Sequence, residues 1–455
     1  MLGRRALVAA RPPPATPIPS LAGTDAMPNP TPIATRALAE RAGVAMLYLL
    51  AASAFLSTAL ASIAMAGLAL AFVLAPPAPR APWHWSPASL AVVALCLLVV
   101  ARAAVAALDP SVPHGLLWES ALDWCKLLLF IPFAHFLAGE RPRALRLLGL
   151  ALAGLALGML WRLDWGLLAS DPGAFLGERD QYGFTAIATG LYTGSALLGL
   201  MLMRERLLAR AAQAFPRWSL ILAWGLLLGL FALGFLQSQS RGSWVAWLPA
   251  LLLGLVLAAP ARARLDGRVL RRALWIAVLA AVVLVLVAFQ ADDLLWRMRE
   301  DLAWISGARE GTAASSLGQR WSAQLVGLSL WLEHPWFGWG PGLSQWLMDL
   351  SGDPGVRDGA GVALRHLHNT YLEVLVQFGV AGLFCCALLT LALLTASWRG
   401  CAGDRLLRAL LIALWCYLLL WELTNYRMVR HDWLMYWILL AGLSQGLGRR
   451  LNRAG

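Results

Sequence analysis

Residues 365–382 read RHLHNTYLEVLVQFGVAG, and the rest of the chain is organised around this stretch. Its first part is polar and closes the longest polar loop of the sequence, and its second part enters a long apolar segment. His368, whose side chain titrates near neutral pH, is therefore placed where water meets a bilayer. We expect a membrane scaffold that brings arginines to this point.

The composition is that of a membrane protein. Of 455 residues, 60% are hydrophobic and 14% are charged, and the charges are concentrated between long apolar runs. The net charge of +12 would also suit a nucleic-acid-binding protein. However, the arginines fall in short gaps between apolar segments, as in proteins that obey the positive-inside rule. We therefore expect contact with membrane lipids and no nucleic-acid partner.

The apolar pattern predicts an all-α polytopic integral membrane protein with about twelve transmembrane helices. The run at 43–75 is interpreted as two short helices in a hairpin, with one long tilted helix as the alternative. The other spans are predicted at 88–107, 117–138, 144–161, 184–203, 218–238, 243–259, 271–290, 370–397, 406–424 and 432–448.

The arginine clusters set the orientation. If the first run is a hairpin, the clusters at 204–217 and 262–272 lie on the same side as the N-terminus, which the positive-inside rule makes cytoplasmic. Both termini are then cytoplasmic. We expect a disordered cytoplasmic tail at residues 1–40 and nine membrane helices at 41–290. A large outer loop at 291–367, three more membrane helices at 368–448 and a short cytoplasmic tail at 449–455 follow.

The outer loop has a helical signal of its own. Ser316 followed by Gln319 fits a capping box. Five apolar residues then recur at helical spacing on one face: Leu317, Trp321, Leu325, Leu328 and Leu332. Pro335 ends this helix, and a turn rich in aromatic residues and glycine follows at 336–342. An amphipathic helix of this kind is predicted to lie at the membrane surface over the bundle.

Arginines on the predicted outer side are contrary to the positive-inside bias, so each of them is expected to bind an anionic partner. Arg241 lies in the polar turn at 237–243, where a new helix begins and its free backbone N–H groups also favour an anion. The guanidinium group suits phosphate oxygens, and a lipid headgroup is the alternative ligand. Three further arginines are candidates for the same role. Arg320 lies in the loop helix and could instead be a solvated surface residue, and Arg179 could form an ion pair with its acidic neighbours. Arg365 lies beside the histidines and could instead cap the loop.

His368 is the candidate general base, because imidazole accepts a proton from a sugar hydroxyl at neutral pH. A structural role at the membrane interface is the alternative. His366 lies two residues away, but no third metal ligand is evident, so neither a metal nor a cofactor is expected. Glu373 lies one helical turn beyond Asn369 and is either an orienting residue or part of the helix surface.

With these residues in place, the chain resembles the O-antigen ligase and polymerase superfamily of bacterial envelopes. His368-Asn369, nine residues and then Gly379-Val380-Ala381-Gly382 fit the family pattern H-[NSQ]-x9-G-x-x-[GTY]. Residues 334–340, HPWFGWG, resemble the H-P-x-x-G-x-G segment of the same loop, and residues 238–242, SQSRG, resemble the S-x-S-R-G turn.

This resemblance implies a GT-C-like glycosyltransferase of the bacterial inner membrane whose active site faces the periplasm. Members move a glycan from undecaprenyl pyrophosphate without ATP or metal. By resemblance, Arg241 and Arg320 hold the pyrophosphate and His368 activates the acceptor, with inversion at the anomeric carbon. Arg179, Arg365, Asn369 and His366 are the expected substrate-binding residues.

Three activities occur in the superfamily: transfer to lipid A-core by a ligase, joining of two lipid-linked chains by a polymerase, and transfer to a protein hydroxyl. One dominant outer loop, and a chain that ends soon after its last predicted span, favour the ligase, with lipid A-core as the acceptor. A lipid-linked glycan transporter is the alternative from another class. A transporter predicts charges deep inside the spans and a repeat of two halves, and few such charges are seen.

Overall fold

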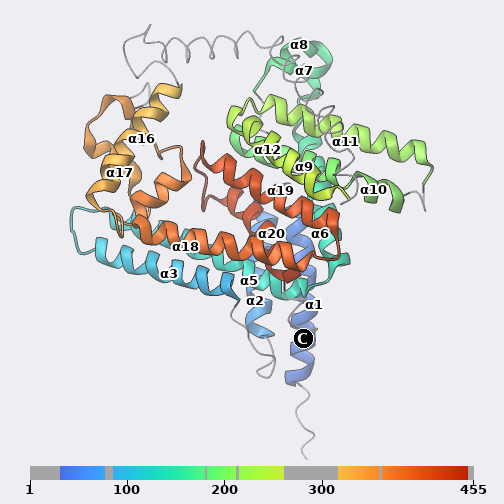
Figure 1. Ribbon diagram of the computed structural model, residues 1–455, viewed down its shortest axis with the longest axis horizontal. Coiled ribbons are helices and arrows are strands. Elements are labelled where there is room, and N and C mark those ends of the chain that lie inside the picture. The colour runs from blue at the N-terminus through green and yellow to red at the C-terminus, as the bar shows by residue number, and fades with distance from the viewer. Residues whose placement is uncertain are drawn as a thin grey trace, which may run out of the picture.

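The computed structural model describes residues 31–76, 86–179, 182–211, 215–260, 316–357 and 361–448, and these segments form a bundle of helices (Figure 1). The helices are α1 (Thr31–Ser53), α2 (Thr58–Leu74), α3 (Pro87–Ala106), α4 (His114–Cys125), η1 (Lys126–Leu129), α5 (Phe130–Leu137), α6 (Arg141–Arg162), α7 (Trp165–Ser170), α8 (Pro172–Gly177), α9 (Ala186–Leu202), α10 (Arg204–Ala211), α11 (Arg217–Gln237), α12 (Arg241–Ala258), α16 (Ser316–Glu333), α17 (Ser344–Ser351), η3 (Pro354–Val356), α18 (Thr370–Gly400), α19 (Arg405–Glu422) and α20 (His431–Gly448). The span predicted at 271–290, most of the N-terminal tail and the tail at 449–455 lie outside the described residues.

The prediction of an all-α membrane protein is confirmed. Six segments of the described chain are long and apolar enough to cross a membrane: Pro87–Ala106, His114–Leu137, Arg141–Arg162, Arg217–Gln237, Arg241–Ala258 and Thr370–Gly400. Helices α2 and α9 are shorter apolar helices. The total of about twelve spans and their orientation stay predictions.

The first apolar run contains two helices rather than one. Helix α1 ends at Ser53, and α2 begins after Ser57, whose hydroxyl accepts a hydrogen bond from the Leu60 backbone N–H at 3.4 Å. The two helices pack closely, because a Cβ on Gly67 would lie 2.7 Å from the sulfur of Met46. Positions 46 and 67 are nearly equidistant from the break, as expected for an antiparallel hairpin.

The span predicted at 117–138 is divided locally. A short 3₁₀ segment, η1, separates α4 from α5. Pro132 has no backbone N–H to donate to the carbonyl four residues earlier, and this favours a tighter local turn. The segment still continues in one direction as a candidate span from His114 to Leu137.

Helix α20 lies at the centre of the bundle, because its side chains from Trp433 to Leu447 are all buried. Its neighbours include α5, α18 and α19. The indole N–H groups of Trp415 and Trp433 donate to the Ser444 hydroxyl and the Glu422 carboxylate, at 3.0 and 3.1 Å. These bonds join α19 to α20 and fix the loop at 423–430 that connects them.

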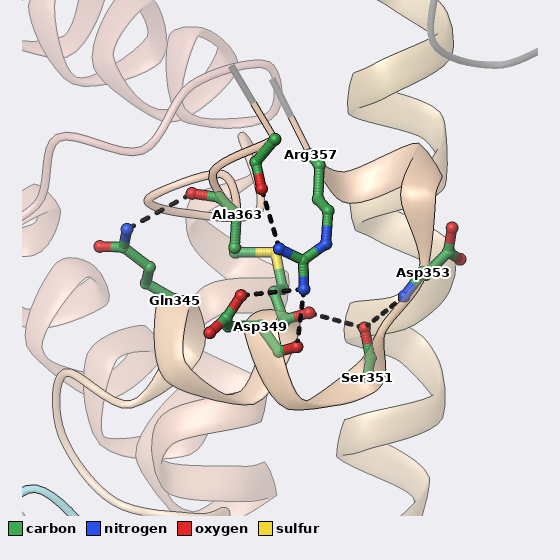
Figure 2. Close-up of polar contacts among 8 residues, drawn as sticks. Gln345, Asp349, Ser351, Asp353, Arg357 and Ala363 are labelled. Carbon is green, nitrogen blue, oxygen red and sulfur yellow. Dashed lines mark hydrogen bonds and ion pairs between the residues drawn. The ribbon is translucent and has the colours of Figure 1, made fainter. Parts of the chain in front are cut away.

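The described part of the outer loop has a small core of its own, which includes Ala323 of α16 together with Leu343 and Leu347. Figure 2 shows the polar clamp that closes its second half. Arg357 donates to the Asp349 and Gly361 carbonyls at 3.1 and 2.8 Å, and pairs with the Asp349 carboxylate at 2.9 Å. This clamp fixes the chain a few residues before the histidine loop.

Candidate functional site

The His-Asn pair lies in the short loop that enters α18. Asn369 is the N-cap of this helix, and its side-chain oxygen accepts hydrogen bonds from the backbone N–H groups of Tyr371 and Leu372 at 3.0 and 3.1 Å. These bonds satisfy donors of the first helical turn. His368, just before the cap, has a left-handed backbone with φ of 56°, so the chain turns sharply there. The structure thus gives Asn369 a capping role.

The two histidines of this loop are in contact. The rings of His366 and His368 meet edge to face with centroids 4.3 Å apart, and His366 also lies 5.7 Å from the ring of Tyr426. The Nδ1 atom of each histidine is buried and has no hydrogen-bond partner within the described part of the chain. Each Nδ1 atom therefore has an unused capacity to accept or donate a hydrogen bond.

Both imidazoles are held neutral at physiological pH. Burial, with contributions from His366 and Arg320, lowers the pKa of His368 to about 3. Burial likewise lowers the pKa of His366 to about 4, and three positive charges contribute to this, those of Arg427, Arg430 and Arg320. A neutral imidazole carries a lone pair that accepts a proton, so the free protein presents His368 in the state that a base requires.

Arg320 comes to the histidines from the loop helix α16. Its Nη1 donates to the Thr424 carbonyl at 3.3 Å, and its charge acts on both imidazoles. Because Thr424 lies in the loop between α19 and α20, this contact connects the outer loop with the bundle.

The turn that contains Arg241 reaches the same loop. Arg241 is the first residue of α12, and a Cβ on the next residue, Gly242, would lie 2.2 Å from the Thr424 hydroxyl. The Ser243 hydroxyl donates to Ser240 at 2.7 Å and accepts from the Trp421 indole at 3.1 Å, which fixes the turn against α19. The sequence S-x-S-R-G therefore encodes a tight turn in which small residues allow close approach. Gly242, the residue after Arg241, and the side chain of Arg320 thus approach Thr424 from two different elements.

Arg179 contacts the same turn. Its Nε donates to the Ser238 carbonyl at 3.4 Å, and the Gln239 side chain donates to the Gly177 carbonyl at 3.2 Å. The segment before α9 is thus fastened to the turn before Arg241. Arg365 is exposed on the loop before His366, and the structure gives it no comparable anchor among the described residues.

Sequence reasoning missed the loop at 423–430, which reads LTNYRMVR and joins the other parts of the site. The Thr370 hydroxyl donates to the Asn425 carbonyl at 2.8 Å, Tyr426 lies against His366, and Arg427 pairs with Asp432. A usable signal was present, because Arg427 and Arg430 are further arginines on the predicted outer side.

The two glycine motifs form one structural feature. Helix α18 breaks at Gly379, where φ is 62° and ψ is −161°. The segment after His334 inserts its backbone there. The Trp339 and Gly340 N–H groups donate to the carbonyls of residues 376 and 377, and the N–H groups of residues 380 and 381 donate to the carbonyls of 335 and 336. The Gly338 carbonyl accepts from Arg102 of α3 at 2.7 Å. The charge of Arg102 thus has a structural use.

A buried polar connection joins this feature to the histidine loop. Glu373 accepts from the Leu367 backbone N–H and from the Gln377 side chain, each at 2.9 Å. The Gln377 oxygen in turn accepts from the Gly342 N–H at 3.3 Å. Of the two interpretations of Glu373, the geometry supports the orienting residue, because its side chain is buried rather than on the helix surface.

Taken together, helices apolar and long enough to span a membrane, and arginines and histidines gathered around one loop, define in the described residues a helical membrane protein with a polar candidate site. The comparison with protein families then specifies the group: residues 225–387 match the family model described as O-antigen ligase. This match confirms the resemblance seen in the three motifs. The matched residues contain all three motifs, whereas Arg179 and the loop at 423–430 lie outside them. No curated protein matches the chain.

Proposed function

We propose that this protein is an O-antigen ligase. It transfers polysaccharide from undecaprenyl pyrophosphate to a sugar hydroxyl of lipid A-core, on the periplasmic face of the bacterial inner membrane, and needs neither ATP nor metal. The observation that supports this proposal is that Arg320, His366 and Gly242, the residue after Arg241, each approach the loop at 423–430.

In the proposed reaction, His368 takes the proton of the acceptor hydroxyl. The oxygen of that hydroxyl forms a bond to the anomeric carbon, and the bond from that carbon to the pyrophosphate oxygen breaks. Undecaprenyl pyrophosphate leaves with the electron pair, and direct displacement inverts the anomeric centre. His368 is neutral in the free protein, and the negative charge of a bound pyrophosphate would raise its pKa toward the range in which imidazole is an effective base.

Arg241 and Arg320 bind the pyrophosphate, whose negative charge increases as the glycosidic bond breaks. Fixed cationic donors aimed at a developing charge lower the barrier without reorganisation at the moment of reaction. Arg179 is a third donor-binding residue, because the Ser238 contact holds it beside the turn of Arg241. His366 and Arg365 contact the acceptor, and Asn369 supports the loop as the helix cap.

Reconstitution tests the proposal. Purified protein in vesicles is supplied with lipid-linked glycan and lipid A-core, without ATP or added metal. A ligase produces glycan-bearing lipid A-core. A polymerase lengthens the lipid-linked chain without needing lipid A-core, and a transporter forms no covalent product. Either of the last two results would refute the ligase assignment.

A further inference from the structure

The apolar face predicted for the loop helix is real, but it points away from the protein. The residues on this face, Leu317, Trp321, Leu325, Leu328 and Leu332, are all exposed, and Leu332 retains 63% of its accessible surface. The opposite side of α16 carries Ala323 and Leu330, which are buried in the core of the outer loop. Helix α16 is therefore apolar on two sides, and the described residues cover only one of them. We call the uncovered side the α16 stripe.

The α16 stripe continues into a membrane span. Trp336 and Phe337, just after α16, are exposed, and the Trp336 carbonyl accepts a hydrogen bond from Ala381 of α18 at 3.1 Å. Beyond this junction, α18 exposes Phe384 and Leu391, at 62% and 61%. Since α18 is long and apolar enough to cross a membrane, these exposed side chains are expected to face lipid. Exposed apolar side chains thus lie on both sides of this junction, on the loop helix and on the candidate span.

The direction of α16 fits the same surroundings. In Figure 1, α16 runs at a steep angle to α18 and α3, near the end where α18 begins. A helix that crosses the ends of spanning helices lies roughly in the plane of the bilayer. Helices that expose an apolar face in this orientation bury it at the boundary of headgroups and acyl chains.

We propose that the α16 stripe is embedded in the outer leaflet of the membrane and thereby holds Arg320 at the level of the lipid headgroups. Arg320 precedes Trp321 of the stripe and points to Thr424 at the mouth of the site. A pyrophosphate attached to a membrane lipid lies at this same depth. The choice of the outer leaflet rests on the predicted orientation, and the depth of Arg320 rests on the proposed function.

The occupant is the bilayer rather than a protein partner, because the stripe continues the lipid-facing side of α18. A protein docked on the stripe would need to extend into the membrane to cover Phe384 as well. Exposed apolar patches of this extent are otherwise rare on surfaces that face water.

Photo-crosslinking tests whether the α16 stripe lies in the membrane, and it does not depend on enzyme activity. The photoreactive residue p-benzoylphenylalanine replaces Leu328 on the stripe or, as the control, Glu333, which is exposed and lies about 140° further around the helix. The full chain is placed in vesicles of phosphatidylethanolamine and phosphatidylglycerol, and lipid adducts are measured by mass spectrometry. We expect at least about fivefold more lipid adduct at position 328. Equal yields, or protein adducts in place of lipid at position 328, would overturn the proposal.

A second arm separates the seating from its consequence for catalysis. Leu328→Asp places a charge in the leaflet and is expected to raise the KM for the lipid-linked donor about tenfold, whereas Leu328→Phe leaves it unchanged. If lipid adducts form but Leu328→Asp has a normal KM for the donor, the depth assigned to Arg320 is wrong, although the α16 stripe does lie in the membrane. If no variant or wild type transfers glycan, the proposed function fails, and the crosslinking result is unaffected.

Discussion

Substitution of Gly379 by alanine should disable the protein, because this glycine is where helix and loop meet. Its φ of 62° and ψ of −161° belong to a region that side chains other than glycine's hardly enter. A Cβ there would lie 2.3 Å from the carbonyl carbon of Trp336, which is backbone and cannot rotate away. The strain costs about 1–3 kcal/mol. Displacing the loop also loses the two bonds from residues 380 and 381, about 1 kcal/mol each.

The expected total loss is therefore about 3–5 kcal/mol, concentrated where the outer loop joins α18. Gly225→Ala is the matched control, since no atom lies within 4 Å of a Cβ at that helical position of α11. The measurements are the thermal unfolding of the purified protein in detergent and the rate of glycan transfer in vesicles. Gly379→Ala should unfold at a clearly lower temperature and lose transfer, while Gly225→Ala matches wild type or exceeds its stability. Equal stability and activity of the two variants would refute the proposed junction.

Further predictions concern the site itself. Because the pKa of His368 is about 3, kcat/KM should stay level from neutral pH down to about pH 5. Arg320→Gln removes a nearby positive charge and should raise that pKa, so the fall of kcat/KM in acid should move to higher pH. A fall near pH 6.5 in both proteins would contradict this. Glu373→Ala leaves the Leu367 N–H buried and unpaired, so it should lower kcat about a hundredfold with little change in the KM for the donor. In the same kinetic assay, Glu373→Asp should recover part of the rate. Arg241→Lys should retain charge but lose the paired donors, so donor affinity measured by vesicle binding should fall about tenfold, and full affinity would exclude a bidentate contact.

The features that depend on periodicity could be predicted from the sequence. The helix boundaries near residues 87, 141, 217 and 370 follow from apolar runs with polar or proline-containing ends, and the structure places helices there. The break in the first apolar run was predictable because a single helix would have inverted every later arginine cluster. The S-x-S-R-G turn was likewise visible as a polar interruption between two spans.

Long-range contacts could not be predicted in this way. The glycines after His334 were interpreted as a turn, yet their purpose is to let a backbone approach the break at Gly379, about 40 residues later. Local pattern carries no information about which distant carbonyl a loop will bind. The loop at 423–430 was missed for the same reason, since Thr424 and Tyr426 matter through what they contact. The apolar face of α16 was identified correctly, but whether it faces the bundle or lipid depends on the other side of the helix.

We propose above all that the imidazole of His368 is the base and that the nearby arginines hold the donor. The rate of glycan transfer by His368→Ala in vesicles, measured at a donor concentration at which the variant binds as much lipid-linked glycan as wild type, tests this most directly. We expect normal donor binding and a transfer rate at least about a thousandfold lower than that of wild type. Transfer at the wild-type rate by the His368→Ala protein would contradict it.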